Sequence, residues 1–176
     1  MAMTEVKPRI YCGTYAKYNA GNLAGAWLDL EDYTDTDAFY DACRELHKDE
    51  TDPEYMFQDF EGFPRALYSE SPDQDKLEKL YSWLGKTEDE RAIVAAYWDS
   101  IDGDADPDTA LEAYAGTYST EADWAEEFLK DTGALESIPE NLRYYFDFEA
   151  YARDCRLSGD VTFCDSPEGV MVFHNT

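Results

Sequence analysis

The chain has 176 residues, of which 40 are Asp or Glu and only 14 are Lys or Arg, so its formal net charge is −26. This charge excludes binding to DNA or RNA, which needs a basic surface, and the 44% apolar and 15% aromatic content excludes a disordered acidic tail. A compact globule of this length is about 40 Å across, which gives roughly one charge per 1.5 Å. Duplex DNA carries one per about 1.7 Å, so the composition favours a polyanion that imitates nucleic acid.

The N-terminal third predicts a small sheet with one helix. Residues 9–15 and 25–30 are strand-like runs, and residues 56–60 alternate apolar and polar side chains like a third strand. From Thr36 to about Lys48 the apolar residues recur at helical spacing, which predicts a single helix.

The middle third predicts helices only. Ser71 and Pro72 are typical of an N-cap and a first helical position, and Gly85 ends the helix that they begin. Thr87 and Glu90 form a capping box for a second helix. A turn and a short third helix follow.

The C-terminal third predicts two helices and a closing hairpin. Thr120 caps a helix that stops at Gly133. A further helix begins at Phe148 and runs into Gly159, which suits a left-handed cap. The strand-like segments within residues 161–173 predict the hairpin.

These elements predict an α+β fold: an elongated chain of three small lobes, two with small antiparallel sheets plus helices and a helical middle lobe. The lobes are expected at residues 1–62, 63–113 and 114–176. No run of about 18 apolar residues occurs, and residues 1–9 lack the apolar core of a signal peptide. We therefore expect a cytoplasmic protein that does not contact the membrane.

Residues 92–129 contain no Lys or Arg. The ten acids of this stretch are the predicted partner-binding residues, with carboxylates in place of phosphates: Asp99, Asp102, Asp104, Asp106, Asp108, Glu112, Glu121, Asp123, Glu126 and Glu127. Like-charged helical neighbours cost about 0.2–0.5 kcal/mol of stability per pair, and the run itself holds no counterion. That the sequence keeps this cost favours a function for the negative electrostatic field of the run. The alternative is an acidic interaction module of a salt-adapted organism, whose partner has no connection with DNA.

Catalytic and metal chemistry are not indicated. Asp102, Asp104 and Asp106 alternate as in a calcium loop, but Pro107 and Ala113 replace the glycine and the bidentate Glu that such a loop needs. No nucleophile, phosphate-loop or dinucleotide motif occurs. We expect no enzyme activity, no cofactor and no metal.

The remaining chemically active side chains are predicted to be structural. His47 and His174 are expected to be surface or packing residues. The four cysteines lack CxxC spacing and lie in apolar patterns, which predicts buried reduced thiols: Cys12, Cys43, Cys155 and Cys164.

Three stretches resemble the ArdA family of antirestriction proteins, which are DNA mimics carried by mobile genetic elements. They are IYCGTYAKYNAGNLAGAWLDLED at residues 10–32, YSTEADWAEEFLKDTGALESIPENLRYYFDFEAYARD at 118–154 and AYARDCRLSGD at 150–160. The third is similar to the antirestriction motif of that family. The residues of interest in it are Ala150, Tyr151, Ala152, Arg153, Asp154, Leu157, Gly159 and Asp160.

The resemblance implies a homodimer that joins through the C-terminal lobe and occupies the DNA-binding groove of type I restriction-modification enzymes, which blocks restriction and sometimes modification. Within the motif, Glu149 and Arg153 are spaced for an i, i+4 ion pair. Tyr151, Arg153, Leu157 and Asp160 are expected either to support the C-terminal lobe or dimer contact, or to touch the enzyme.

Overall fold

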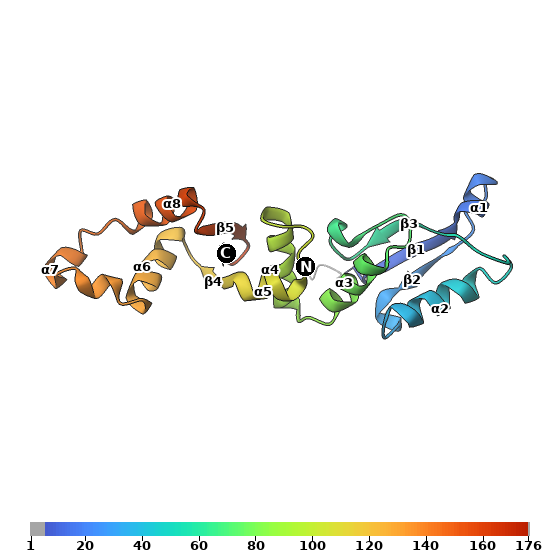
Figure 1. Cartoon of the computed structure of the whole chain (residues 1–176), viewed down its shortest axis with the longest axis horizontal. Helices are drawn as coiled ribbons and strands as arrows, with labels where there is room; N and C mark the ends of the chain where they lie inside the picture. Colours follow the sequence, from blue (N-terminus) through green and yellow to red (C-terminus); the bar gives the residue numbers. More distant parts are fainter. Residues whose placement is uncertain (1–5, 176) are drawn as a thin grey trace. The chain divides into compact units, whose positions relative to one another are not determined.

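In a computed structural model, which describes residues 6–175, the chain forms two compact units. We call residues 1–91 unit 1 and residues 92–176 unit 2. Each described unit contains one three-stranded antiparallel sheet with helices packed beside it (Figure 1). The α+β class is therefore confirmed, with 49% helix and 20% strand.

Unit 1 is a sheet flanked by two longer helices. Its strands and helices are β1 (Arg9–Thr14), α1 (Tyr15–Asn19), β2 (Ala26–Asp29), α2 (Thr36–Leu46), β3 (Tyr55–Glu61), α3 (Gln74–Leu84) and the first turn of α4 (Glu88–Ser100). Short 3-10 turns cover Leu30–Asp32 and Arg65–Leu67.

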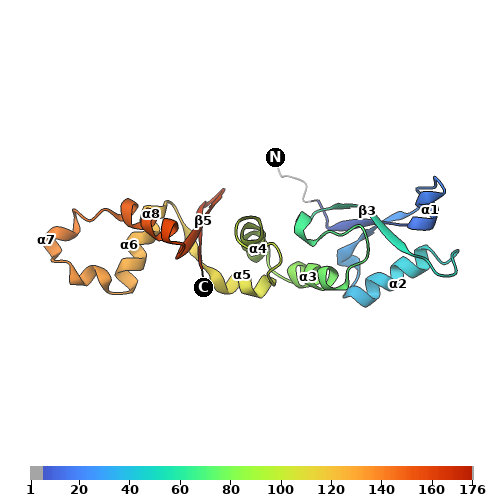
Figure 2. The ribbon, with the colours of Figure 1, turned by 45° about the horizontal axis from the view of Figure 1, so that its top comes forward.

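The sheet of unit 1 has the order β2-β1-β3, so β1 is the central strand. In its register Ile10 lies opposite both Leu28 and Phe60. Helix α2 runs along one side of this sheet in both ribbon views (Figures 1 and 2). Phe39 of α2 meets Phe57 of β3 edge to face at 5.8 Å between ring centroids, and both side chains are buried. This contact fixes the helix on the sheet.

The predicted start of helix α3 (Gln74–Leu84) is wrong by two residues. Helix α3 begins at Gln74, and Asp73 caps it by accepting a hydrogen bond from the Lys76 backbone N–H at 3.1 Å. The Ser71 hydroxyl instead lies 2.7 Å from the Tyr15 hydroxyl. That hydrogen bond joins residues 56 positions apart, so it was invisible to local sequence rules. The five-residue helix α1 was not predicted either.

Unit 2 contains a second sheet of the order β4-β6-β5. Its elements are the rest of α4, then α5 (Pro107–Ala113), β4 (Tyr114–Tyr118), α6 (Glu121–Asp131), a 3-10 turn (Ala134–Ser137), α7 (Glu140–Arg143), α8 (Phe148–Ser158), β5 (Val161–Ser166) and β6 (Gly169–His174).

The sheet of unit 2 is covered on both faces. Successive side chains of a strand point to opposite faces, and the neighbours Val172 and Phe173 of β6 are both fully buried. Val172 packs in a core with Trp124 of α6 and Ala152 of α8, whereas Phe173 packs with Ile93 of α4. Helices α6 and α8 therefore lie on one side of the sheet and α4 on the other.

Several predicted element ends are confirmed. Thr87 and Glu90 exchange the two hydrogen bonds of a capping box, at 2.8 and 3.3 Å. Thr120 accepts the Asp123 backbone N–H at 3.1 Å and begins α6. Gly159 ends α8 in the left-handed conformation with φ 84°. The C-terminal hairpin is formed by β5 and β6.

The contacts divide the chain between residues 91 and 92, inside α4. Helix α3 belongs to unit 1, and α5 belongs to unit 2. The division into three lobes stays a prediction. No helix among residues 6–175 combines the length and apolarity needed to cross a bilayer.

Candidate functional site

The ten predicted partner-binding acids all lie in unit 2, on α4, α5, α6 and the loop between α4 and α5. We call these ten residues the acidic surface. Eight are exposed: Asp99, Asp102, Asp104, Asp106, Asp108, Glu112, Asp123 and Glu127. On α6 the side chains of Asp123 and Glu127 are exposed, whereas Trp124 between them in the sequence is only 2% exposed.

Two of the ten acids are half-buried and pair with bases that lie outside the run. Glu121 Oε1 accepts from Arg156 Nη1 of α8 at 2.8 Å, and Glu126 Oε1 accepts from Lys130 Nζ at 2.7 Å. Lys130 lies just beyond the base-free stretch, and Arg156 is 35 residues from its partner. Packing of α8 against α6 brings the Arg156 side chain to Glu121.

Unit 2 holds 19 of the 40 acids but only 4 of the 14 bases, which gives it a net charge of −15. All four bases are engaged within the unit. Lys130 and Arg156 form the two ion pairs above, Arg153 Nε lies 4.0 Å from Asp154 Oδ1, and Arg143 donates to the backbone carbonyls of Ile138 and Glu136. None of these contacts involves Asp99, Asp102, Asp106 or Glu112.

The loop between α4 and α5 is held by its own hydrogen bonds. Asp102 Oδ1 accepts from the Asp104 backbone N–H at 2.9 Å, and the Trp98 indole N–H donates to the Ala105 carbonyl at 2.8 Å. Trp98 is 5% exposed, so this loop is tied to a buried side chain. The carboxylates at the loop are thereby presented on an ordered backbone.

The motif residues divide into a core set and an exposed set. Ala152 is fully buried, and Tyr151 packs against the same core. Ala150 is half-buried, and its backbone N–H donates to Oδ1 of Asp147, the residue that caps the start of α8. Gly159 forms the left-handed cap described above. Arg153, Asp154, Leu157 and Asp160 are exposed.

The expected Glu149–Arg153 ion pair is not found among the described residues, where the acid nearest to Arg153 in an ion pair is Asp154. Glu149 and Arg153 instead line an open cavity of about 540 Å³ together with Thr120, Glu121 and Arg156. In this cavity Arg156 of α8 forms an ion pair with Glu121 of α6. The ion pair therefore joins α6 to α8 and does not lie within α8.

Sequence reasoning missed a cluster around His47 in unit 1. His47 is 1% exposed, and the nearest side-chain ligand atoms of His47, Asp49 and Glu50 lie within 4.8 Å of one another. The Lys17 ammonium already lies among them, 3.0 Å from His47 Nδ1, 2.9 Å from Asp49 Oδ1 and 3.4 Å from Glu50 Oε1. The closeness of the three residues in the sequence was the signal, and Lys17 supplies the positive charge that a metal ion would supply.

Electrostatics of the cluster follow from these contacts. The hydrogen bond to Asp49 raises the pKa of Lys17, with a further contribution from Glu50. The same bond lowers the pKa of Asp49. On the buried side, His47 Nε2 lies 3.1 Å from the Cys12 carbonyl oxygen, which joins the cluster to β1. The arrangement connects α1, the end of α2 and the central strand.

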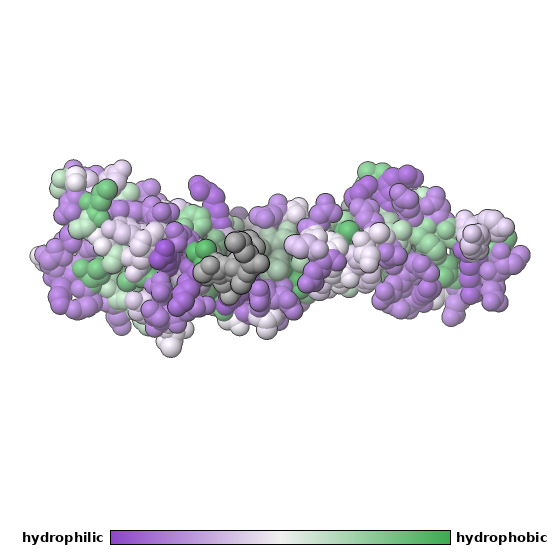
Figure 3. All heavy atoms as spheres, turned by 180° about the vertical axis from the view of Figure 1, so that it is seen from behind, coloured by the Kyte–Doolittle hydropathy of each residue, from purple (hydrophilic) through white to green (hydrophobic). Residues whose placement is uncertain are grey.

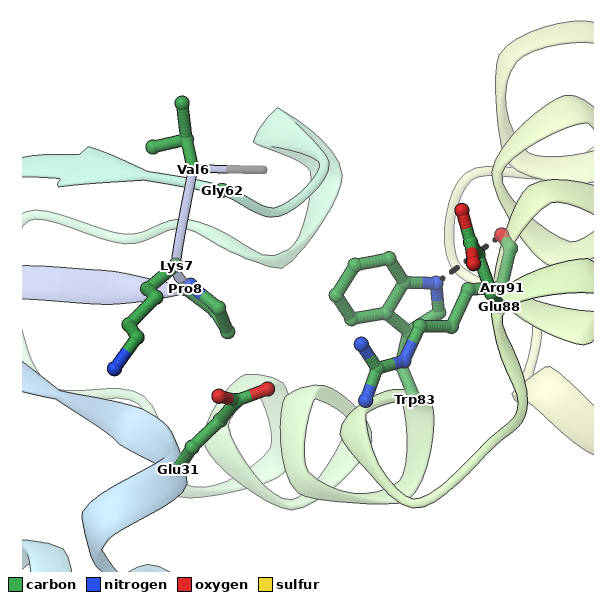
Figure 4. Close-up of a pocket in the computed structure, with 8 residues that line it drawn as sticks. All are labelled: Val6, Lys7, Pro8, Glu31, Gly62, Trp83, Glu88 and Arg91. Atoms are coloured by element: carbon green, nitrogen blue, oxygen red, sulfur yellow. Dashed lines mark hydrogen bonds between the residues drawn. The ribbon is translucent and has the colours of Figure 1, made fainter. Parts of the chain in front are cut away.

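A cavity of about 360 Å³ in unit 1 is lined by both signs of charge (Figure 4). The Arg91 guanidinium lies over the Trp83 ring at 5.1 Å, and the indole N–H of Trp83 donates to the Arg91 carbonyl at 3.3 Å. Figure 4 shows the Glu31 carboxylate and the Lys7 ammonium on the opposite side of the hollow. This mixed lining does not extend the acidic surface, and the Trp83–Arg91 contacts tie α4 to α3.

All four cysteines are free thiols. The prediction of burial is confirmed for Cys12, Cys43 and Cys164, whereas Cys155 is half-buried at the edge of the unit 2 core. A hydrogen bond with Cys12, together with burial, raises the pKa of the Cys43 thiol. His174 is exposed and lies near the rings of Trp124 and Phe128.

Unit 2 also exposes large apolar side chains near its motif. Leu142, Tyr144 and Tyr145 on and after α7 are 50%, 90% and 78% exposed, and Leu157 of α8 is 74% exposed. Hydrophilic residues otherwise predominate on the face seen in Figure 3, where apolar areas are small. Exposed aromatic side chains next to polar surroundings are typical of protein interfaces.

The model of the family described as antirestriction protein (ArdA) matches residues 10–169 of the 176-residue chain. A search of curated proteins found no match. The family match covers the acidic surface and the motif on α8, and it ends at Gly169, the first residue of β6.

Proposed function

Because this chain belongs to the ArdA family of antirestriction proteins, we propose that it acts as a DNA mimic that occupies the DNA-binding groove of a type I restriction-modification enzyme. The family membership implies antirestriction activity against type I systems and an inhibitor rather than an enzyme. The mimicry and the place of binding are the proposal.

The observation that carries the proposal is the charge of unit 2. Eight carboxylates of the acidic surface are exposed, and unit 2 carries 19 acids against only 4 bases. A protein groove that binds DNA is lined by Lys and Arg, and its affinity for the phosphate backbone comes largely from release of counterions. Carboxylates fixed on α4, α5 and α6 offer the same charge to that groove without a reactive phosphodiester.

No chemical step is needed for this inhibition. The inhibitor and DNA compete for one site, so restriction is blocked while the groove is filled, and modification is blocked where the methyltransferase uses the same groove. Charge complementarity of this kind accelerates association and makes the affinity sensitive to salt.

We further propose that the active form is a homodimer joined through unit 2. The exposed side chains Leu142, Tyr144, Tyr145 and Leu157 support this, because contact between two chains of charge −26 requires a surface with little net charge. On this proposal Leu157, the exposed apolar residue of the α8 motif, serves the dimer contact, and the buried Ala152 serves the core.

The proposal is tested by titrating the purified protein into a cleavage assay with a type I enzyme and an unmodified DNA substrate. Inhibition should be overcome by excess DNA and weakened by added salt. Methylation by the same enzyme should be measured in parallel. Inhibition that neither DNA nor salt relieves would contradict groove occupation.

The oligomeric state is tested separately by sedimentation. A dimer is expected, and Tyr144→Ser together with Tyr145→Ser should shift it toward monomer. A monomer at all concentrations would contradict the proposed dimer. It would not affect the proposal that the protein occupies the DNA-binding groove.

A further inference from the structure

A groove in unit 2 combines an apolar floor with an acidic rim. It lies between α4 and the β5–β6 hairpin and has a volume of about 420 Å³. Its α4 wall is made of Ala92, Ala96, Asp99 and Ser100, and its hairpin wall is made of Phe163, Cys164, Asp165, Ser166, Pro167 and Met171.

The groove exists because α4 presents small side chains to it. Ala92, Ala96 and Ser100 follow one another at a spacing of four residues, so they form one row along the helix. The larger residues Ile93 and Tyr97 of the same helix pack into the core with Phe173. The helix is thus held on the sheet while its small row leaves open space above the hairpin.

The wall and floor of the groove are fixed by the core beneath them. Cys164 is 7% exposed, and its Sγ lies 4.0 Å from the Ala96 carbonyl oxygen. The Tyr97 ring meets Phe173 edge to face at 5.5 Å. Both contacts join α4 to the hairpin, so the groove is a built feature of unit 2 rather than a gap between moving parts.

The charged residues of the groove are Asp99 and Asp165, one on each wall, and both are exposed. Phe163 and Met171 supply apolar surface between them. A Lys or Arg side chain has the matching chemistry, because its alkyl stem favours apolar surface and its charged end favours a carboxylate. Imitation of phosphates by charge alone needs no apolar floor.

We propose that this groove takes one basic side chain, Lys or Arg, from the DNA-binding surface of the target enzyme. The inference rests on the proposed function and adds an anchoring point to it. A second copy of this chain fits poorly, because it carries a charge of −26 and the bases of its unit 2 are engaged. Side chains desolvated in a pocket of this kind dominate the affinity of many interfaces.

The test uses matched variants of the full-length protein in the cleavage assay. Asp165→Asn and Glu168→Gln each remove one negative charge from an exposed position of the same hairpin, but only Asp165 lines the groove. We expect Asp165→Asn to raise the inhibitor concentration at half inhibition by about tenfold, the equivalent of roughly 1.4 kcal/mol. Glu168→Gln should raise it less than about twofold.

A second pair tests the shape of the groove without changing charge. Ala92→Met extends a side chain into the groove from an exposed position, and Ala134→Met adds the same bulk at an exposed position outside it. We expect the first to weaken inhibition by about fivefold and the second to leave it unchanged. Far-UV circular dichroism and thermal melting of all four variants verify that each is folded.

The outcomes separate the two proposals. Inhibition by the wild-type chain together with losses in Asp165→Asn and Ala92→Met, but not in their controls, supports the groove. If the wild type inhibits but the groove variant and its control in either pair have equal effects, the proposal for the groove is overturned. The proposal of DNA mimicry is then unaffected. Absence of inhibition by the wild type against every type I enzyme tested overturns both.

Discussion

The two units reach similar folds with different charge. Each contains a three-stranded antiparallel sheet and helices packed on it. Unit 1 has 21 acids and 10 bases, whereas unit 2 has 19 acids and 4 bases. Because one fold pattern tolerates both compositions, the depletion of bases in unit 2 is not a requirement of folding. It is better explained by what the surface of that unit binds.

The bases of unit 1 also have structural tasks. Lys17 neutralises the cluster around His47, Arg9 Nε donates to Glu61 Oε2 at 2.8 Å, and Arg91 covers Trp83. In unit 2 the comparable stabilisation comes from aromatic packing. Trp124 stacks on Phe128 at 5.2 Å and meets Phe163 edge to face at 5.3 Å.

The largest expected effect comes from removing the core of one unit at a time. Trp124→Ala should cost about 3–5 kcal/mol of the free energy of unfolding, because a buried indole is lost and a cavity remains. Phe39→Ala should cost a similar amount in unit 1, where Phe39 is fully buried.

Hydrogen exchange followed peptide by peptide measures these two variants. If the units unfold separately, Trp124→Ala accelerates exchange in residues 92–176 only, and Phe39→Ala does so in residues 1–91 only. Equal acceleration in both units would show that they unfold as one body. Trp124→Ala should also lose inhibition, because the helix that carries Glu126 and Glu127 loses its support.

A smaller effect is expected from neutralising exposed acids without disturbing the core. The variant Asp99→Asn, Asp102→Asn, Asp106→Asn and Glu112→Gln should weaken inhibition about 10- to 100-fold, since each surface charge contributes at most about 1 kcal/mol. Asn keeps the side-chain oxygen that can cap a turn or a helix. The measurement is the inhibitor concentration at half cleavage.

The matched control places the same four changes in unit 1. Asp32→Asn, Asp37→Asn, Asp52→Asn and Glu54→Gln alter the total charge equally and lie at exposed positions. We expect this variant to lose less than about threefold. Equal losses in the two variants would mean that total charge matters and that unit 2 has no special part.

The Lys17 cluster allows a test of stability in unit 1. Lys17→Met leaves His47 and two carboxylates without their shared cation and should destabilise the unit by roughly 1–2 kcal/mol at neutral pH. Urea unfolding at several pH values measures it. Arg44→Met is the control, because Arg44 forms an exposed ion pair with Asp41 on the surface of α2.

The pH dependence follows from the pKa shifts. Asp49 has a folded pKa below its ordinary 3.8, so its contribution is present at neutral pH and is lost as the pH falls through that lowered value. Lys17 has a folded pKa above its ordinary 10.5, so its contribution is lost only as the pH rises through that raised value. Lys17→Met should therefore flatten the acid side of the stability profile. An unchanged acid side would contradict the assigned pair.

The smallest expected effect is that of salt on folding. Screening of like charges should stabilise unit 2 more than unit 1, by up to about 1 kcal/mol between low and moderate salt. The protein should nevertheless be folded at low salt. Unfolding at low salt would favour the interpretation as an acidic module of a salt-adapted organism.

Much of the fold was predictable because its signals are local. The capping box at Thr87, the cap at Thr120, the glycine at 159 and the C-terminal hairpin depend on residues within a few positions of one another. The α3 start was misplaced because Ser71 bonds to Tyr15 across 56 positions. The candidate site shows the same limit, since Glu121 met its counterion Arg156 only through packing of α6 against α8.

The sequence by itself determined the charge, the absence of bases from residues 92–129, the α+β class and the family. These are sums or short patterns, so no folding is needed to evaluate them. Only the tertiary structure decided which acids are neutralised, that Lys17 lies in the centre of the His47 cluster, and that α4 and a hairpin 60 or more residues later enclose a groove. Those features arise from contacts between distant segments, and the geometry of such contacts is fixed by packing of the cores.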